Sequence, residues 1–311
     1  MNGTFNDLLL IPAALPPLLW LQRQLGLRSH DLAPSASEIF GHWLVWSLVC
    51  EGLGPLLFQR AVADWHDIIA YAVGALVAGL WWSRPIGFDF LAPHYSWMET
   101  LLAGKKLHLC RTTFLAELPP RQHALLAGEG HGRFLTELLK SQPTLKITCV
   151  DSSSGMLQVT RSRLRQENLP EDRVTFLQKD FLHWTPQKAE YDLIATHFFL
   201  DCFTHEQLGS LIPSLAQSAR PGALWLTADF QVPPAGLFIR YRAALILWMM
   251  YRFFRIVVRL PAKRIVPTAP FLEKNGFRRQ KHREFDWKLL YSELWQKAPG
   301  EQLLTSVAAI E

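Results

Sequence analysis

The sequence predicts a doubly wound α/β sheet over residues 87–300, preceded by an N-terminal helical region over residues 1–86. From Arg121 the chain follows the order of strand, glycine turn, helix and strand, which is typical of such a sheet. Before residue 85 it carries three apolar stretches instead. A length of 311 residues fits one full α/β domain with a smaller appendage. We expect residues 301–311 to form a flexible tail.

The three apolar stretches cover residues 8–21, 39–58 and 68–82. Prolines interrupt the first stretch, and only the second reaches the ~20 residues that a membrane-spanning helix needs. Several of the twelve tryptophans lie in the first hundred residues, as expected near a membrane interface. We therefore predict an α-helical membrane hairpin of two, at most three, membrane segments.

Charge bias predicts how this hairpin is oriented. Arg23 and Arg28 precede the second stretch, and Lys105 and Lys106 follow the third, which places the α/β domain on the cytoplasmic side, most simply of a bacterial inner membrane. Small residues recur every four positions in the third stretch and predict close packing against a neighbouring helix, for which we expect the second stretch. These small residues are Ala70, Gly74 and Ala78.

The alternative is that the stretches are buried helices of a soluble N-terminal domain, because Glu51, His42 and the prolines are unfavourable in lipid. The segments EGLGP, at 51–55, and ADWHDIIAYAVGAL, at 63–76, resemble those of small VanZ-like membrane domains of bacteria.

The glycine turn is the first sign of a ligand site. Residues 123–127 predict a buried strand, residues 128–132 form the turn GEGHG, and residues 133–141 predict a helix. Glycines allow the backbone to approach a ligand closely. The next strand ends at Asp151, where a carboxylate can accept hydrogen bonds from both hydroxyls of a ribose. Dinucleotide-binding enzymes share both features, so the turn alone does not decide between them.

Four later segments narrow the choice: DSSSGML at 151–157, VTFLQKDF at 174–181, YDLIATHFFLD at 191–201 and RPGALWLTADF at 220–230. Together with the turn they resemble the class I S-adenosylmethionine-dependent methyltransferases, over about residues 88–297. FDFLAPHYSWME, which begins at Phe88, is similar to the segment at the entrance of quinone and lipid methyltransferases. The resemblance implies a seven-stranded Rossmann-like sheet and S-adenosyl-L-methionine as cofactor.

The resemblance also implies cofactor contacts. Asp151 would hold the ribose, Met156 would lie beside the adenine and Asp180 would contact its amino group. Many family members carry an acid where this chain has Leu126, and Glu129 either compensates for it or faces solvent. The predicted cofactor-binding residues are Gly128, Glu129, Gly130, Gly132, Asp151, Ser152, Met156, Asp180, Phe181 and His197.

Each of these residues also has a purely structural interpretation: the glycines form a tight turn, Asp151 caps a helix and Asp180 is a surface acid.

Methyl transfer from a sulfonium requires alignment and the exclusion of water, and it needs a base only for a hydroxyl or an acidic carbon acceptor. His197 follows the fourth predicted strand, where it could take a proton, with Asp201 orienting it. The alternative is a histidine satisfied by the backbone. Tyr95 and His94 are rival candidates for a lid or an acceptor contact.

The insertion over residues 236–261 predicts an interfacial helix. Arg240, Arg252, Arg255 and Arg259 fall on one side of its helical wheel, and apolar residues form a wide opposite face. The alternative is a buried cover helix whose solvent face carries the arginines. The first interpretation predicts a lipid bilayer and a lipophilic acceptor as partners.

The charge of +5 comes without an interleaved basic and aromatic module, so we expect no nucleic acid. Four widely spaced cysteines predict no metal.

The sequence thus predicts a membrane-tethered S-adenosylmethionine-dependent methyltransferase with a lipophilic acceptor, such as a quinone precursor or a phospholipid. Two other hypotheses stay open. One is a non-catalytic membrane scaffold that retains the fold, and the other is a methyltransferase of a soluble small molecule with a helical N-terminal cap.

Overall fold

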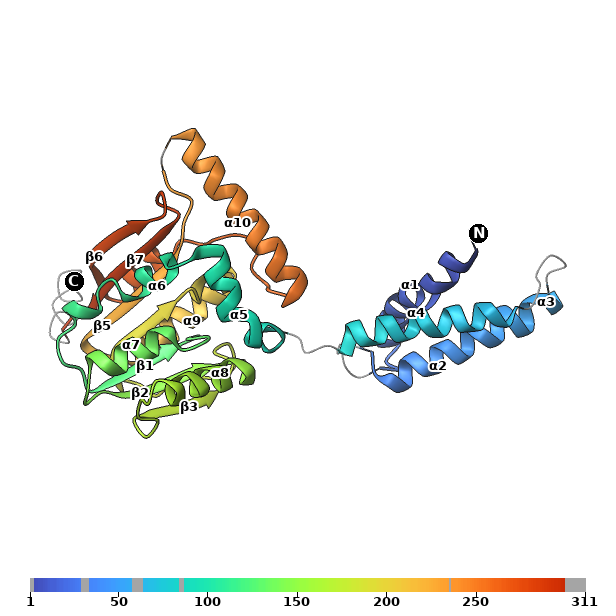
Figure 1. Ribbon diagram of the computed structural model, residues 1–311, viewed down its shortest axis with the longest axis horizontal. Helices are drawn as coiled ribbons and strands as arrows, with labels where there is room; N and C mark the ends of the chain where they lie inside the picture. Colours follow the sequence, from blue (N-terminus) through green and yellow to red (C-terminus); the bar gives the residue numbers. More distant parts are fainter. Residues whose placement is uncertain (1–2, 29–33, 58–63, 84–86, 235, 300–311) are drawn as a thin grey trace, which may run out of the picture. The chain divides into compact units, whose positions relative to one another are not determined.

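The computed structural model describes residues 3–28, 34–57, 64–83, 87–234 and 236–299 (Figure 1). The chain divides into two compact units, Met1–Pro85 and Ile86–Glu311. Each unit is described by itself. The predicted flexible tail, residues 301–311, lies outside the described residues.

The N-terminal unit is helical. Its first helix, α1, continues through Pro12, Pro16 and Pro17, although we expected the prolines to interrupt this stretch. Ile11, Leu15 and other apolar side chains of α1 pack against α4 and form the core of the unit. The elements are α1 (Gly3–Gln24), α2 (Ala36–Ser47), the π-helical segment η1 (Leu48–Leu53), α3 (Gly54–Leu57) and α4 (Trp65–Ser83).

The small residues of α4 do allow a close helix approach, but the predicted partner is wrong. A Cβ added at Gly74 would collide with the backbone carbonyl oxygen of Leu8, so the closest neighbour at this position is α1. The second apolar stretch meets α4 nearby, where a Cβ at Gly79 would lie 3.2 Å from Cδ1 of Ile39. Helix α1 is continuous despite its prolines, and it packs against Gly74, where we expected the second stretch.

None of the helices in the described ranges combines the length and the apolar character needed to cross a membrane. The second stretch is divided among α2, η1 and α3, and η1 contains Glu51. The carboxylate of Glu51 accepts hydrogen bonds from the Tyr71 hydroxyl at 2.9 Å and from the Asp64 N–H at 2.8 Å. The predicted spanning hairpin is therefore not found among these helices.

The second unit confirms the predicted seven-stranded doubly wound sheet. Its strand order is β3-β2-β1-β4-β5-β7-β6. The first five strands pair in parallel, and β7 lies antiparallel between β5 and β6. The strands are β1 (His123–Ala127), β2 (Lys146–Asp151), β3 (Val174–Gln178), β4 (Tyr191–His197), β5 (Ala219–Phe230), β6 (Phe277–Phe285) and β7 (Leu290–Lys297).

Helices cover both faces of this sheet (Figure 1). Phe134 and Leu138 belong to the core on one face, and Leu208 and Trp225 belong to the core on the other. Strand order reverses between β1 and β4, which is where open α/β sheets bind ligands. The helices are α5 (Phe88–Ala103), α6 (Lys106–Thr112), α7 (Arg133–Ser141), α8 (Ser154–Gln166), α9 (His205–Ser218), α10 (Leu237–Val257) and α11 (Ala269–Lys274), with short 3-10 turns at η2 (Leu115–Glu117) and η3 (Leu200–Cys202).

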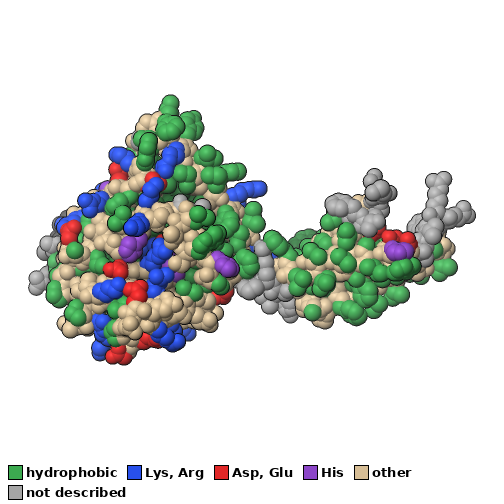
Figure 2. All heavy atoms as spheres, in the orientation of Figure 1, with side chains coloured by type: hydrophobic (Ala, Val, Ile, Leu, Met, Phe, Trp, Pro, Cys, Tyr) green, Lys and Arg blue, Asp and Glu red, His purple; other side chains and the backbone are tan. Residues whose placement is uncertain are grey.

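Helix α10 is the predicted insertion, and its two faces differ. Ala243, Leu247 and Tyr251 are buried against the domain, as expected of a cover helix. The opposite face is exposed and carries Arg252, but it is also apolar, because Phe238 is 73% and Trp248 is 62% exposed. Figure 2 shows hydrophobic side chains gathered over α10, together with basic ones. The helix thus combines features of both interpretations.

Candidate active site

A cavity of about 740 Å³ brings the predicted site residues together. The carboxyl ends of β1, β2 and β4 line it, as do α5, α6 and α10. The predicted residues that line it are Tyr95, Gly128, Glu129, Gly130, Asp151, Ser152, Met156, Asp180, Phe181, His197 and Asp201. Gly132 does not line it.

The three glycines of the turn have different tasks. All have positive φ, at +64° for Gly128, +69° for Gly130 and +82° for Gly132. A Cβ at Gly128 would collide with the ring of Phe199, and a Cβ at Gly132 would lie 2.8 Å from Cγ2 of Thr160. A Cβ at Gly130 would meet nothing within 4 Å. Gly128 and Gly132 therefore permit tight packing, whereas Gly130 has open space beside its Cα, and its N–H and carbonyl are hydrogen-bonded to Asp151 and Thr160.

Asp151 ends β2 and joins the glycine turn. Its carboxylate accepts hydrogen bonds from the N–H of Gly130 at 3.2 Å and of Ser153 at 2.9 Å. Burial raises the pKa of Asp151 to about 6, although these hydrogen bonds act to lower it. The side chain that caps α8 is Ser153, which accepts from the N–H of Met156 at 3.0 Å. Asp151 is therefore not the cap of α8, and its carboxylate keeps lone pairs that a ligand hydroxyl could use.

Glu129 does not face solvent. Its Oε1 accepts hydrogen bonds from the N–H groups of Phe134 and Leu135, at 3.0 Å each, in the first turn of α7. A carboxylate at this end of a helix is stabilised by the helix dipole. Burial nevertheless raises its pKa to about 7. Leu126, at the position where many family members carry an acid, is packed in the core. The carboxylate in this part of the cavity is therefore that of Glu129, in the glycine turn.

Asp180 and Phe181 follow strand β3 and line the cavity. The carboxylate of Asp180 accepts from the Leu182 N–H at 2.9 Å and hydrogen-bonds Nδ1 of His183 at 2.9 Å. It thus forms the surface turn of the structural alternative while it also lines the cavity. Phe181 is buried and meets the ring of Phe199 edge-on, with centroids 5.4 Å apart. This pair adds an aromatic wall.

His197 is buried, and the predicted pairing with Asp201 is not formed. Neither of its ring nitrogens has a hydrogen-bond partner among the described residues, so the backbone does not satisfy it either. Its ring meets Phe134 edge-on at 4.4 Å. Burial, followed by the charge of Arg111, lowers the pKa of His197 to about 3. The imidazole is therefore neutral, and its polar atoms are available to a ligand.

Asp201 has other partners instead. Its Oδ1 accepts a weak hydrogen bond from the Cys202 thiol at 3.6 Å, and its backbone carbonyl accepts from the Tyr251 hydroxyl at 3.0 Å. Burial raises the pKa of Asp201 to about 6. The pKa of Asp229, buried at the end of β5, is also raised, by burial and by the charge of Asp201. Phe198, between the two predicted catalytic residues, has φ of +52°, a strained conformation of the kind that clusters at functional sites.

A buried ion cluster was not predicted. Glu99 of α5 accepts hydrogen bonds from both terminal nitrogens of Arg111, at 2.8 Å each, and from Arg133 at 3.0 Å. The ring nitrogens of His131 have no hydrogen-bond partner in the described structure. Its Nε2 lies 3.7 Å from Oε2 of Glu99. Glu99, Arg111 and His131 all line the cavity. Glu99 was visible in the sequence as the last residue of FDFLAPHYSWME, but nothing marked its partners.

The amino end of α5 is fixed in a similar way. The Asp89 carboxylate accepts hydrogen bonds from the Ser153 hydroxyl and the Gly155 N–H, at 2.7 Å each. Asp89 thereby joins α5 to the first turn of α8. Together with the Glu99 cluster it holds α5 at the glycine turn, next to Tyr95, whose pKa is raised by burial.

The remainder of the cavity lining is mostly apolar. It comes chiefly from α5, α10 and β7, with Lys106, Arg242 and Asp286 as polar neighbours. The apolar residues include Phe88, Met98, Phe230, Ile246, Met249, Met250, Phe253, Phe254, Leu260, Leu289 and Leu290. Such a mixture of apolar walls and a few placed polar groups is typical of small-molecule sites.

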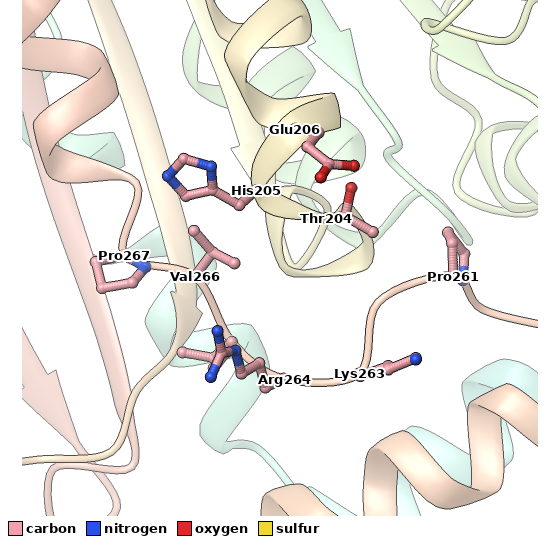
Figure 3. Close-up of a pocket in the computed structure, with 9 residues that line it drawn as sticks. Thr204, His205, Glu206, Pro261, Lys263, Arg264, Val266 and Pro267 are labelled. Carbon is pink, nitrogen blue, oxygen red and sulfur yellow. The ribbon is translucent and has the colours of Figure 1, made fainter.

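A second hollow of about 550 Å³ contains none of the predicted residues. It lies between the start of α9 and residues 261–267, and Figure 3 shows Thr204 and Glu206 side by side at the helix start. Thr204 and Gln207 form a reciprocal capping box there. Within the described ranges, no cluster of three or more His, Cys, Asp or Glu residues is arranged to hold a metal ion.

Comparisons with known proteins agree with this geometry. Residues 124–222 match the family model described as a methyltransferase domain. A demethylmenaquinone methyltransferase of Porphyromonas gingivalis is 29% identical over 125 residues, which are 39% of this chain and 51% of that protein. One of Chlamydia felis is 30% identical over 95 residues, which are 30% of this chain and 39% of that protein. The chain thus spans about half, or less, of the length of these curated relatives.

Solved structures share the fold. An O-methyltransferase family protein from Burkholderia thailandensis has a TM-score of 0.50 at 16% identity, over 91% of this chain and 83% of that one. The mitomycin 7-O-methyltransferase has a TM-score of 0.50 at 15% identity, over 71% of this chain and 63% of that one. The α/β unit therefore has the Rossmann-like fold of these methyltransferases, and residues 124–222 are similar to a methyltransferase domain, while the roles of individual site residues stay predictions.

Proposed function

We propose that the protein transfers a methyl group from S-adenosylmethionine to a lipophilic acceptor. One observation carries this proposal: a single cavity joins the residues predicted to bind the cofactor to apolar walls from α5, α10 and β7. The two curated relatives are named demethylmenaquinone methyltransferases, so demethylmenaquinone is the first acceptor to test.

The residues present fit the cofactor. Asp151 offers carboxylate oxygens for the ribose hydroxyls, and the open space beside Gly130 leaves room for a ligand there. Phe181 offers an aromatic surface next to Asp180, near which the adenine would lie. At the turn, the carboxylate of Glu129 suits the ammonium of the methionine moiety, and the unpartnered ring of His131 offers a donor for its carboxylate. When bound, the cofactor supplies an activated methyl group.

The pKa values support different roles for His197 and Asp201. A general base works best when its pKa lies near the working pH, and Asp201, at about 6, meets this requirement. His197, at about 3, is too weak a base, but its neutral ring can donate a hydrogen bond that orients an acceptor oxygen. Tyr95 is a further hydrogen-bonding group in the cavity. A base is needed only for a hydroxyl or acidic carbon acceptor.

Titration calorimetry of the full chain with S-adenosylhomocysteine tests the cofactor site. We expect binding that Asp151→Ala abolishes and that Asp172→Ala, an exposed acid outside the cavity, leaves unchanged. Transfer of isotope-labelled methyl groups into demethylmenaquinone and into a lipid extract tests the reaction. Binding without any labelled lipid would contradict the proposed reaction and favour a non-catalytic scaffold.

A second observation supports attachment to a membrane surface, which we propose for the cytoplasmic side of a bacterial inner membrane. The exposed face of α10 combines apolar side chains, such as Phe238 and Trp248, with Arg252 and Arg255. Apolar groups enter the acyl boundary of a bilayer, and arginines bind anionic headgroups. The bilayer would then deliver a lipophilic acceptor to the cavity that α10 lines.

Flotation with lipid vesicles tests this attachment. We expect binding to phosphatidylglycerol vesicles that weakens about 30-fold in the double variant Arg252→Gln, Arg255→Gln, because each arginine contributes about 1 kcal/mol near an anionic surface. Trp248→Asp should weaken binding to phosphatidylcholine vesicles as well. Lys146→Gln, an exposed position on β2, serves as the control. A protein that stays with the soluble fraction would support a methyltransferase of soluble small molecules instead.

A further inference from the structure

Three charged residues meet at the apolar part of the cavity, and none of them is among the residues predicted to bind the cofactor. Lys106, the first residue of α6, donates a hydrogen bond to Oδ1 of Asp286 at 2.6 Å. Arg242 of α10 donates to Oδ2 of the same carboxylate at 3.1 Å and to the backbone carbonyl of Asp286 at 3.4 Å. All three residues line the cavity. We call them the Lys106 cluster.

The turn that carries Asp286 is held by several contacts. Asp286, Trp287 and Lys288, between β6 and β7, have φ of +46°, +56° and +66°, which non-glycine residues rarely adopt. The guanidinium of Arg242 lies over the ring of Trp287, 5.8 Å from its centre. The Asp286 side chain is only 9% exposed. Helix α6, helix α10 and the turn therefore converge on one fixed arrangement.

The cluster carries an excess positive charge. Burial would raise the pKa of Asp286, but the hydrogen bonds from Lys106 and Arg242 outweigh burial and lower it, so the carboxylate is ionised. One carboxylate then faces two cations. An ammonium has three N–H donors and a guanidinium has five, whereas the described hydrogen bonds of both side chains go to Asp286 alone. Donors remain for a further acceptor.

The other cations of the cavity lining have different surroundings. Arg111 is neutralised by its bidentate pair with Glu99. Lys179 lies directly before Asp180, in the region assigned to the adenine. The apolar part of the cavity therefore has one uncompensated cationic group, next to Ile246 and Met249 of α10.

We propose that the Lys106 cluster binds an oxyanion, a carboxylate or a phosphate, at one end of an otherwise apolar methyl acceptor. This inference rests on the proposed function, because it names the substrate class of the same cavity. Charge-assisted hydrogen bonds to oxyanions are stronger than neutral ones, and an arginine can form two of them side by side. The exposed fractions, 54% for Lys106 and 28% for Arg242, place the oxyanion near the mouth, with the apolar body along α10.

The test compares chains that differ only in their head group. Octanoate, octyl phosphate and octanol are titrated by calorimetry into the full chain with S-adenosylhomocysteine, and inorganic phosphate alone is the fourth probe. We expect both charged amphiphiles to bind about tenfold or more tighter than octanol. Inorganic phosphate should bind far more weakly than octyl phosphate, since it lacks the apolar body. Equal affinities for octanol and the charged amphiphiles would overturn the proposal, and so would equally tight binding of inorganic phosphate.

Variants distinguish a binding role from a structural one. Lys106→Gln with Arg242→Gln should remove the preference for the charged amphiphiles and keep octanol binding. Asp286→Asn keeps both cations and removes their competitor, so it should strengthen octanoate binding several-fold. Lys146→Gln, at an exposed position on β2 outside the cavity, should change neither. If Asp286→Asn and the double variant weaken octanol and octanoate equally, the cluster only holds the three elements together and the proposal is wrong.

Failure of the proposed function gives a different result. In that case S-adenosylhomocysteine does not bind, or no methylated lipid forms, whatever the head-group preference. Failure of the Lys106 cluster alone leaves binding of S-adenosylhomocysteine and octanol intact and removes only the preference for the oxyanion.

Discussion

Replacing Glu99 by glutamine should destabilise the α/β unit strongly. The side chains of Glu99 and Arg111 are 2% and 7% exposed, and the two form paired hydrogen bonds at 2.8 Å. A glutamine keeps the size of the side chain but leaves the charge of Arg111 buried and uncompensated. Breaking a buried ion pair in this way costs about 3–5 kcal/mol. Arg133 loses its 3.0 Å partner at the same time.

Urea unfolding followed by circular dichroism measures this loss. The control is Glu137→Gln, because Glu137 forms an exposed pair with Lys140, and such a pair contributes about 0.5 kcal/mol or less. Replacing both Glu99 and Arg111 by leucine and methionine should cost less than the single change, since no buried charge then remains. A loss below about 1 kcal/mol for Glu99→Gln, or a double variant less stable than the single one, would refute the reasoning.

Three further predictions concern the glycine turn, Asp201 and the Asp286 turn. Gly132→Ala should lower the free energy of unfolding by about 1–3 kcal/mol in urea titrations, because φ is +82° and Thr160 crowds the position. The control Gly209→Ala, in an open position on α9, should raise the free energy of unfolding by about 0.5–1 kcal/mol. The pKa of Asp201 is about 6 in the folded protein and 3.8 without the effect of burial, so between these pH values the folded protein holds a proton that the unfolded chain has lost. The contribution of Asp201 to stability therefore falls as the pH rises through this window, and Asp201→Asn should flatten that part of the stability profile. If Asp201 is the base, kcat/KM rises with pH up to about 6 and then levels off, and a rate independent of pH in this range would exclude it. Asp286→Gly should leave the fold intact by thermal denaturation, because glycine adopts φ of +46° without strain. It should also leave the affinities for octanol and S-adenosylhomocysteine undiminished.

The central strands β1, β2 and β4 could be predicted because each is a short, mostly buried apolar run followed by a turn signal. Strand β1 and helix α7 cover the residues that the sequence indicated, 123–127 and 133–141. The glycine turn was visible for the same reason, since Gly128 directly follows β1 and Asp151 ends β2. Local periodicity and spacing are enough for features of this kind.

Features that depend on contacts distant in sequence were not predictable. Arg111 follows Glu99 by twelve residues with a helix boundary between them, and the Lys106 cluster joins residues 180 apart. The partner of Gly74 was assigned wrongly because proline positions suggested that the first stretch would break, whereas α1 packs as one helix. The pairing of His197 with Asp201 failed because the η3 turn gives Asp201 other partners.

The cavity is lined by two parts of the second unit, one inside and one outside the segment that matches the family model. The family match covers residues 124–222, which include the glycine turn, Asp151 and Asp180. Helices α5, α6 and α10 and the turn at Asp286 all lie outside that range. Under the proposed function, the segment shared with relatives would bind the methyl donor, and the surrounding elements would bind the acceptor. Exchanging α10 and the β6–β7 turn with those of another methyltransferase should change which molecule is methylated and preserve the binding of S-adenosylmethionine.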